Sequence, residues 1–347
     1  MHELSIQKQK GSISLNPTNV VYQYGQINSS IQDYNWQITQ NFGSIPAQLN
    51  QKKLYKEEEK YFDAVSKYTQ VDLEKKSGIL YLEAWKIKSI LNQLDTLKLE
   101  LTEFDSLNTL KYNLGEISLT EKSYASNFIR ELEFNYSNYF IDYQDLLTQL
   151  KVICNCEEEI NFPQERFFAF VNSNETKEGS DVLIAPFSAV ESQKMAEAKT
   201  YKGNYFPEIS LGYFNQQLDG IEGFDGVLLG VNVPIWYKPT KSKIKGAELE
   251  AEIAKNNTEN QLLKINAERN SINNKIESFY PIILSNKENL EQSNILTKAS
   301  NISYKSGEID VWRHINNLNQ ALKAKIQYLE TINKFNQLVV MQNFYNN

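Results

Sequence analysis

Two kinds of hydrophobic pattern alternate along this chain. Over about 19–42 and 206–235, apolar and polar residues alternate with a period of two, which is the pattern of β-strands with one buried face. A polar interruption near 28–33 divides the first stretch, and LDGIEG divides the second, so each stretch predicts a hairpin. Elsewhere, apolar residues recur every three or four positions, which predicts amphipathic helices. The chain is therefore expected to be mainly α with a small β part.

Two of the predicted helices are far longer than those of most globular proteins. They cover about 47–111 and about 240–303, where glycine and proline are scarce. The first would extend roughly 95 Å at about 1.5 Å per residue, and a helix of this length needs similar helices beside it to bury its apolar stripe. Shorter helices are predicted at three further places: about 119–152, 187–203 and 311–341.

The two halves of the chain repeat one another. The segments YNLGEIS (112–118) and YKSGEID (304–310) share Tyr, Gly, Glu and Ile at equivalent positions. We therefore divide the chain into repeat 1 (1–153), an irregular connector (154–186) and repeat 2 (187–347). Each repeat reads as strand, strand, long helix, Gly-Glu-Ile turn and shorter helix. This predicts a tandem repeat of a β-hairpin followed by a long α-hairpin.

The predicted strands have one apolar and one polar face. Gln23, Asn35, Gln37, Thr39, Gly212 and Asn232 are candidates for a water-filled lumen. The candidates for a lipid-facing surface are Tyr22, Tyr24, Tyr34, Trp36, Ile38, Leu211, Tyr213, Val227, Leu229 and Val231. Strands of this kind are typical of membrane barrels. Four strands are too few to close a barrel, so several copies would be needed. The alternative is two ordinary hairpins on a globular core, but helices of this length have no such core to join.

Composition and charge argue against several classes of function. The net charge is −7, whereas nucleic-acid binding normally needs a clustered basic face. The chain holds 2 histidines and the pair Cys154 and Cys156, which is too few ligands for a zinc site. It also has no glycine-rich phosphate loop. We therefore expect no enzyme activity, no metal site and no cofactor. Residues 1–15 lack the apolar middle region of a signal peptide.

From 16 to 341 the order of elements resembles the TolC family of outer-membrane efflux proteins (outer membrane factors). FPEISLGYFNQ, LGVNVPIW and the two Gly-Glu-Ile turns carry the resemblance. It looks closest to heavy-metal members of the CusC or CzcC kind, or to Bacteroidetes-type members fused to CusA-like pumps. The resemblance implies a homotrimer whose four strands per protomer form a twelve-stranded β-barrel in the cell outer membrane. It further implies a continuous α-helical barrel extending into the periplasm.

The same resemblance implies a passive conduit for small solutes or metal ions, driven by an inner-membrane RND-type pump through a periplasmic adaptor (membrane fusion protein). The residues that match the adaptor-docking turns are Gly115, Glu116, Ile117, Gly307, Glu308 and Ile309. Asp310 and Arg313 are the charges expected at the entrance. In some members, acidic residues constrict the entrance at the positions that Arg313 and Asn316 occupy in this chain. Because neither residue is acidic here, we do not expect an acidic gate. Helix capping alone is the simpler interpretation of both turns and of Asp310.

Two expectations limit this interpretation. The family normally has a further helix before the first strands, and too few residues precede strand 1 to form one, so we expect that helix and the leader to be supplied outside this sequence. The alternative function is a non-membrane coiled-coil scaffold or interaction protein. A scaffold has no use for paired hairpins with aromatic outer faces, which favours the duct.

Overall fold

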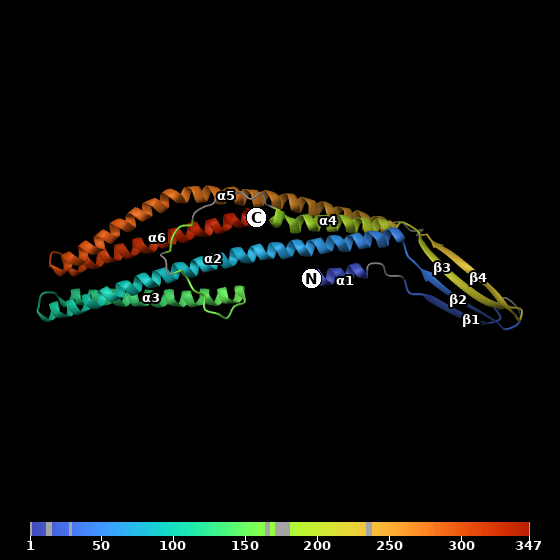
Figure 1. Ribbon diagram of the computed structural model, residues 1–347, viewed down its shortest axis with the longest axis horizontal. Helices are drawn as coiled ribbons and strands as arrows, with labels where there is room; N and C mark the ends of the chain where they lie inside the picture. The colour runs from blue at the N-terminus through green and yellow to red at the C-terminus, as the bar shows by residue number, and fades with distance from the viewer. Residues whose placement is uncertain are drawn as a thin grey trace. The chain divides into compact units, whose positions relative to one another are not determined.

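The protein is mainly α-helical, with one four-stranded antiparallel sheet (Figure 1), as the sequence predicts. The computed structural model describes residues 2–11, 16–27, 30–163, 167–170, 181–233 and 238–346. Its elements, in chain order, are α1 (His2–Lys10), β1 (Asn19–Gly25), β2 (Asp33–Asn41), α2 (Ile45–Asn113), α3 (Leu119–Cys154), α4 (Asp181–Gly203), β3 (Glu208–Leu218), β4 (Ile221–Asn232), α5 (Lys238–Lys305) and α6 (Val311–Tyr345). No described helix has a stretch apolar enough to cross a bilayer.

The chain forms two compact units, and each of them draws on both halves of the sequence. The sheet unit comprises 1–69 and 180–265, and the turn unit comprises 70–179 and 266–347. The long helices α2 and α5 therefore contribute their first part to the sheet unit and the remainder to the turn unit. The compact units thus cut across the two sequence repeats, because each long helix packs against different partners along its length.

The sheet has the order β1-β2-β3-β4, and all neighbours are antiparallel. A two-residue turn, Asp219 and Gly220, joins β3 to β4 with φ of 52° and 76°. Positive φ at both positions is the geometry of the turns that suit the twist of a hairpin. The longer turn predicted at 218–223, with a strand starting at 224, is wrong. Leu218 already pairs with Ile221, because Asp-Gly completes the reversal alone.

The helices of the sheet unit are held together by close backbone approach and by polar contacts. A Cβ added to Gly203, at the end of α4, would lie 2.5 Å from Cα of Ala47 near the start of α2, so only glycine fits there. Ser44 Oγ donates to the Gly203 carbonyl at 2.7 Å. Lys194 on α4 pairs with Glu250 on α5 at 2.7 Å. These contacts fix the helices that adjoin the sheet.

Two sequence expectations about this unit need correction. A helix, α1, does precede the first strand, and its Lys8 pairs with Glu58 of α2 at 2.6 Å. Its polar sequence HELSIQKQK has too few apolar residues to show a helical period. Helix α4 begins at Asp181 rather than at 187. The connector is predicted to extend to 186, but the helix includes Pro186 and buries Leu183.

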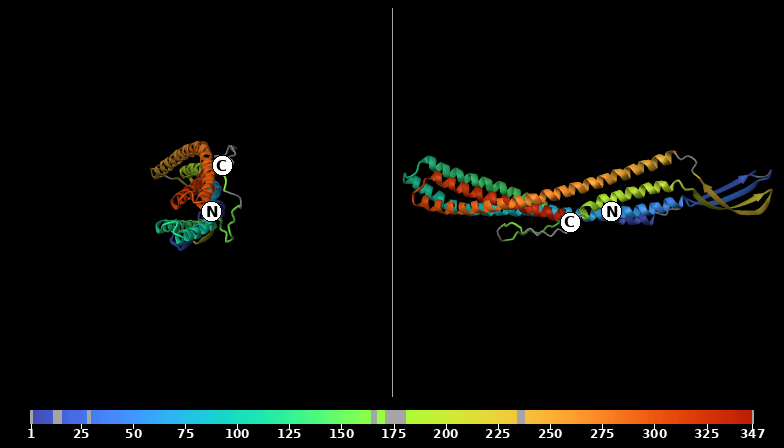
Figure 2. Two further views of the ribbon diagram at one scale, coloured as in Figure 1. Left: turned by 90° about the vertical axis from the view of Figure 1, so that its left-hand side faces the viewer. Right: turned by 90° about the horizontal axis from the view of Figure 1, so that it is seen from above.

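The turn unit consists of two helical hairpins. The last part of α2 pairs with α3, and the last part of α5 pairs with α6 (Figure 2). Their common core includes Phe104 of α2, Phe128 of α3, Tyr304 of α5 and Ile315 of α6. Burying one aromatic side chain contributes about 1.5–3 kcal/mol, so this shared core holds the two hairpins, and therefore their turns, at one end of the unit.

Candidate functional site

The pairing register places all ten predicted lipid-facing residues on one face of the sheet. Tyr22 is opposite Trp36, Ile38 is opposite Tyr213, and Tyr213 is opposite Val227. Because side chains alternate between faces, residues paired in this way share a face. The six lumen candidates all fall on the other face by the same rule: Gln23, Asn35, Gln37, Thr39, Gly212 and Asn232.

The apolar face of the sheet is exposed. Val227 is 69% exposed, Leu229 is 80% exposed, and Tyr22 is 65% exposed. Tyr34 and Trp36 are half-buried, since Trp36 packs against Tyr213 with ring centroids 5.6 Å apart. A contiguous exposed apolar surface of this kind marks a site that meets lipid or another protein. An ordinary hairpin on a globular core would instead bury this face.

The polar face of the sheet carries mainly amides, hydroxyls and glycines, with the apolar residues Val21, Phe214, Phe224 and Leu228 among them. The ring of Phe214 would lie 2.7 Å from a Cβ added to Gly226, so the ring covers this glycine of β4. Gly212 is similarly close to the main chain of β2, with Ile38 O at 2.9 Å from an added Cβ. Among the described residues, no strand pairs with the outer edges of β1 and β4. Unpaired edges of this kind invite another strand.

The two Gly-Glu-Ile turns have the same backbone geometry. Gly115 has φ of 75° and Gly307 has φ of 79°, which is the left-handed conformation that favours glycine. The Glu116 N–H donates to Lys111 O at 2.8 Å, and the Glu308 N–H donates to Ser303 O at 2.8 Å. Each glycine N–H donates to the carbonyl three residues earlier. This pair of bonds is a Schellman cap, and it leaves both turn glutamates exposed.

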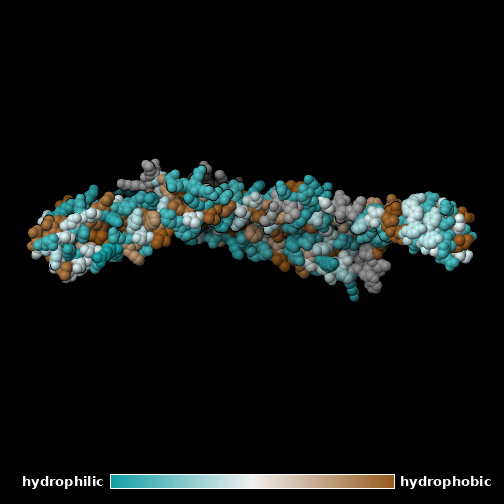
Figure 3. All heavy atoms as spheres, turned by 90° about the horizontal axis from the view of Figure 1, so that it is seen from below, coloured by the Kyte–Doolittle hydropathy of each residue, from teal (hydrophilic) through white to brown (hydrophobic). Residues whose placement is uncertain are grey.

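Each turn leads directly into a capped helix. Ser118 caps α3 in a capping box with Glu121, and Asp310 caps α6 by accepting from the Arg313 N–H at 2.8 Å. Asp310 thus has the capping role, while Arg313 is exposed. Figure 3 shows hydrophobic residues over the end that holds both turns, where Leu114 is 65% exposed. Ile117 and Ile309 instead pack against the core.

Behind the second turn lies a buried polar cluster that sequence reasoning missed. The Tyr304 hydroxyl of α5 donates to Oδ1 of Asn108 on α2, and Asn108 is fully buried. His314 of α6 stacks on Tyr304, with ring centroids 4.7 Å apart. Its Nδ1 lies 2.9 Å from Ser300 Oγ, which also accepts from Asn317 Nδ2 at 3.2 Å. Ser300 therefore has its hydroxyl hydrogen free to donate to His314. The cluster joins the two hairpins.

Burial sets the charge state of this cluster. It lowers the pKa of His314 to about 4, so the ring is neutral near pH 7. It also raises the pKa of Tyr304 to about 12, which keeps the phenol protonated as a donor. The Lys111 ammonium lies 4.4 Å above the Tyr304 ring. His314 is therefore part of a structural contact between α5 and α6.

The fold just described is that of outer-membrane channel proteins. The structure of the outer membrane protein VceC from Vibrio cholerae superimposes with a TM-score of 0.81 at 11% identity, covering 99% of this chain and 89% of that chain. The structure of the outer-membrane channel OprN superimposes with a TM-score of 0.83 at 11% identity, covering 99% of this chain and 84% of that chain. The structure of CusC superimposes with a TM-score of 0.79 at 11% identity, covering 99% of this chain and 86% of that chain. No family model and no curated protein matches the chain in sequence.

These similarities establish the fold at a low level of sequence identity. CusC is no more similar to this chain than VceC or OprN, so the comparison does not distinguish a heavy-metal subtype. The common architecture is a four-stranded antiparallel sheet with long helical hairpins, and the predicted fold class is confirmed. The docking and lipid-facing roles of individual residues stay predictions.

Proposed function

We propose that this protein is the outer-membrane duct of an efflux system and a member of the TolC family. Three copies would close a twelve-stranded barrel in the cell outer membrane, continuous with an α-helical barrel in the periplasm. The observation that carries this proposal is the sheet itself. Ten apolar side chains share one exposed face, the other face carries mainly polar residues and glycines together with Val21, Phe214, Phe224 and Leu228, and the two edge strands are open.

The topology suits closure by copies of the chain. Because the four strands alternate in direction, β4 of one protomer meets β1 of the next in an antiparallel sense. Closure satisfies every backbone group of the edges, which lipid requires because it offers no hydrogen bonds. Barrels of about eight strands are filled by side chains, whereas twelve strands leave a wider lumen. Three copies therefore supply a water-filled path.

The proposal extends to the partners. A periplasmic adaptor would bind the two turns at Gly115 and Gly307, and an inner-membrane RND-type pump would supply the energy. The turns support this role, since two sites with the same Schellman geometry in each protomer give six similar docking positions in a trimer. The cargo is proposed to be small solutes, with heavy-metal ions among them. The chain itself would act as a passive conduit and catalyse no reaction.

A direct test is to express the chain behind a signal sequence and to fractionate the cells. We expect a detergent-dependent trimer in the outer membrane, visible as a heat-sensitive band on gels, that forms stable conducting pores in planar bilayers. Recovery as a water-soluble monomer would overturn the duct and favour the coiled-coil scaffold. The adaptor contact is tested separately, by cross-linking from cysteines introduced at Glu116 and Glu308.

A further inference from the structure

A cavity of about 890 Å³ lies within the turn unit, and neither turn nor sheet accounts for it. Residues of α2, α3, α5 and α6 line it together with the connector segment 159–163. Pockets for small molecules in proteins are commonly about 300–1,000 Å³, so this volume suits one small ligand. A plain coiled-coil interface would fill such a space with interlocking side chains.

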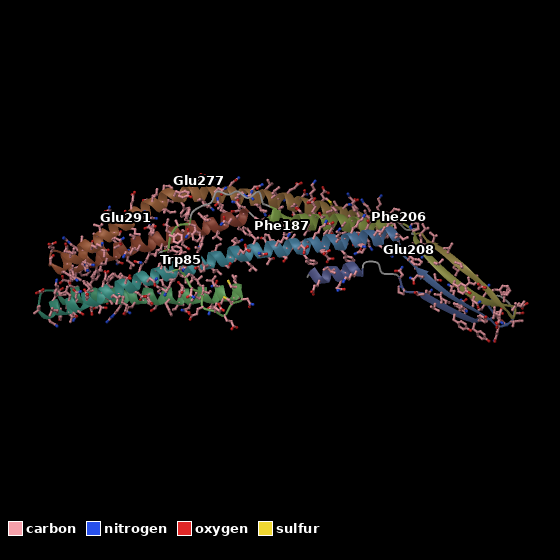
Figure 4. All side chains as sticks on the ribbon, viewed as in Figure 1. Trp85, Phe187, Phe206, Glu208, Glu277 and Glu291 are labelled. Atoms are coloured by element: carbon pink, nitrogen blue, oxygen red, sulfur yellow. The ribbon has the colours of Figure 1, made fainter. Side chains whose placement is uncertain are left out.

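Several aromatic side chains line the cavity. Trp85, which Figure 4 labels on α2, is 4% exposed and meets Phe167 edge to face, with centroids 4.9 Å apart. Tyr143 of α3 lies 6.1 Å from Phe162 of the connector, centroid to centroid. Burial raises the pKa of Tyr143, so its phenol stays neutral. Rings held in fixed positions offer a flat ligand contact area at little cost in entropy.

The charges around the cavity are predominantly positive. Lys88, Lys151 and Lys325 line it, against the single carboxylate Glu159. Among the described residues, Lys88 and Lys325 have no carboxylate within ion-pairing distance, and the Lys88 ammonium lies 5.7 Å from the centroid of the Tyr143 ring. By contrast, Lys75 on the same helix holds Asp72 at 2.7 Å. The chain as a whole has a net charge of −7. Lysines without carboxylate partners around an aromatic cavity therefore give this cavity a local positive potential that favours anions.

We propose that this cavity binds a small organic anion with a flat apolar body, such as an aryl carboxylate or sulfonate. The ring of the ligand stacks against Tyr143 and Phe162, and its anionic group pairs with Lys88 and Lys325. The amides of neighbouring asparagine and glutamine residues donate to the remaining oxygens. A cation is disfavoured by three ammonium groups, and a purely apolar molecule leaves Lys88 and Lys325 without a carboxylate. The proposal stands independently of the proposed duct.

The test uses the full chain in detergent and 2-naphthoate as the probe, measured by titration calorimetry. We expect saturable binding near one molecule per chain. The double variant Lys88→Gln/Lys325→Gln should bind at least about tenfold more weakly, since each charged hydrogen bond contributes appreciably to affinity. The control variant Lys323→Gln removes one positive charge from α6, as Lys325→Gln does, but lies outside this cavity, and it should bind as the unchanged chain does. Partition of the probe into detergent micelles contributes equally in all three samples and does not saturate, so it can be told apart from binding to the cavity.

Further probes separate a specific anion site from simple adsorption. The neutral isostere 2-naphthylmethanol should bind more weakly than 2-naphthoate, and Lys88→Gln/Lys325→Gln should abolish that preference. Circular dichroism checks that each variant is folded. The proposal is overturned by absence of saturable binding, by equal weakening in Lys323→Gln, or by equal affinity for the two probes. Pore formation and trimer assembly are not needed for any of these readouts.

Discussion

Adjacent residues of β4 give a direct test of which face of the sheet meets lipid. Val227 and Leu228 are neighbours at the centre of the strand, so they lie at the same depth, but they point to opposite faces. Val227 pairs with Tyr213 on the apolar face, and Leu228 pairs with Gly212 on the polar face. Both side chains are exposed in the protomer, at 69% and 36%, so neither substitution disturbs a packed core.

The perturbation is arginine at either position. On the lipid face near the bilayer midplane, arginine costs about 2–4 kcal/mol per copy, or about 6–12 kcal/mol for three copies. That is comparable with the whole stability of a typical protein, about 5–15 kcal/mol. Val227→Arg should therefore abolish insertion of the trimer. Leu228→Arg places its charge in water inside the lumen and should leave assembly close to normal.

The assay is folding from urea into lipid vesicles, followed by the heat-sensitive trimer band and by the urea midpoint. One copy at 2–4 kcal/mol corresponds to about a 30- to 900-fold change in the folding equilibrium. Normal assembly of Val227→Arg together with failure of Leu228→Arg would show that the faces are assigned the wrong way round. Normal assembly of both variants would show that this part of the sheet does not lie in lipid.

Three further predictions concern the turn unit. Isoleucine at Gly115 and Gly307 should weaken adaptor cross-linking more than trimer assembly, because each left-handed position costs a β-branched residue about 1–2 kcal/mol and distorts the turn locally. Tyr304→Phe should lower the free energy of unfolding in urea by about 1–3 kcal/mol, because the buried Oδ1 of Asn108 loses its donor. The pKa of His314 is about 4 in the folded chain against 6.5 ordinarily, so its contribution to stability is complete above pH 6.5 and is lost as the pH falls towards 4. The melting temperature should fall over that window, and less so in His314→Gln.

Each of these predictions has an outcome that contradicts it. Unchanged cross-linking in the double isoleucine variant would remove the adaptor role from the turns. Unchanged urea stability of Tyr304→Phe would mean that the Asn108 amide finds another donor. If the melting curves of His314→Gln and the unchanged chain run in parallel between pH 4 and 6.5, carboxylates account for the acid sensitivity rather than His314.

The sequence predicted the elements well wherever a period was long or regular. The helices α2 and α5 have long stretches with few breakers, so no competing structure fits them. The two faces of the sheet also followed from the sequence, because alternation alone assigns a face within each strand. The pairing register shows in addition which strands are neighbours. Residues that the sequence assigns to one face lie on one face in the structure.

Features that depend on one or two residues were harder to predict. The turn at Asp219 and Gly220 was placed within a longer loop, because Ile221 and Glu222 alone do not show that the strand has resumed. The start of α4 is predicted at about 187, although burial of Leu183 extends the helix before that point. The cluster of Asn108, Tyr304 and His314 comes from three helices, and no local pattern reveals contacts between residues so distant in sequence.

The open edges of β1 and β4 have a genetic consequence in the proposed trimer. Each protomer supplies one edge to each of two seams, so one defective chain spoils the ring that it joins. If half of the chains in a cell carried a faulty edge, only about one ring in eight would be built entirely from sound copies. Alleles that damage an edge without preventing association are thus expected to be dominant, whereas alleles that prevent folding altogether should be recessive.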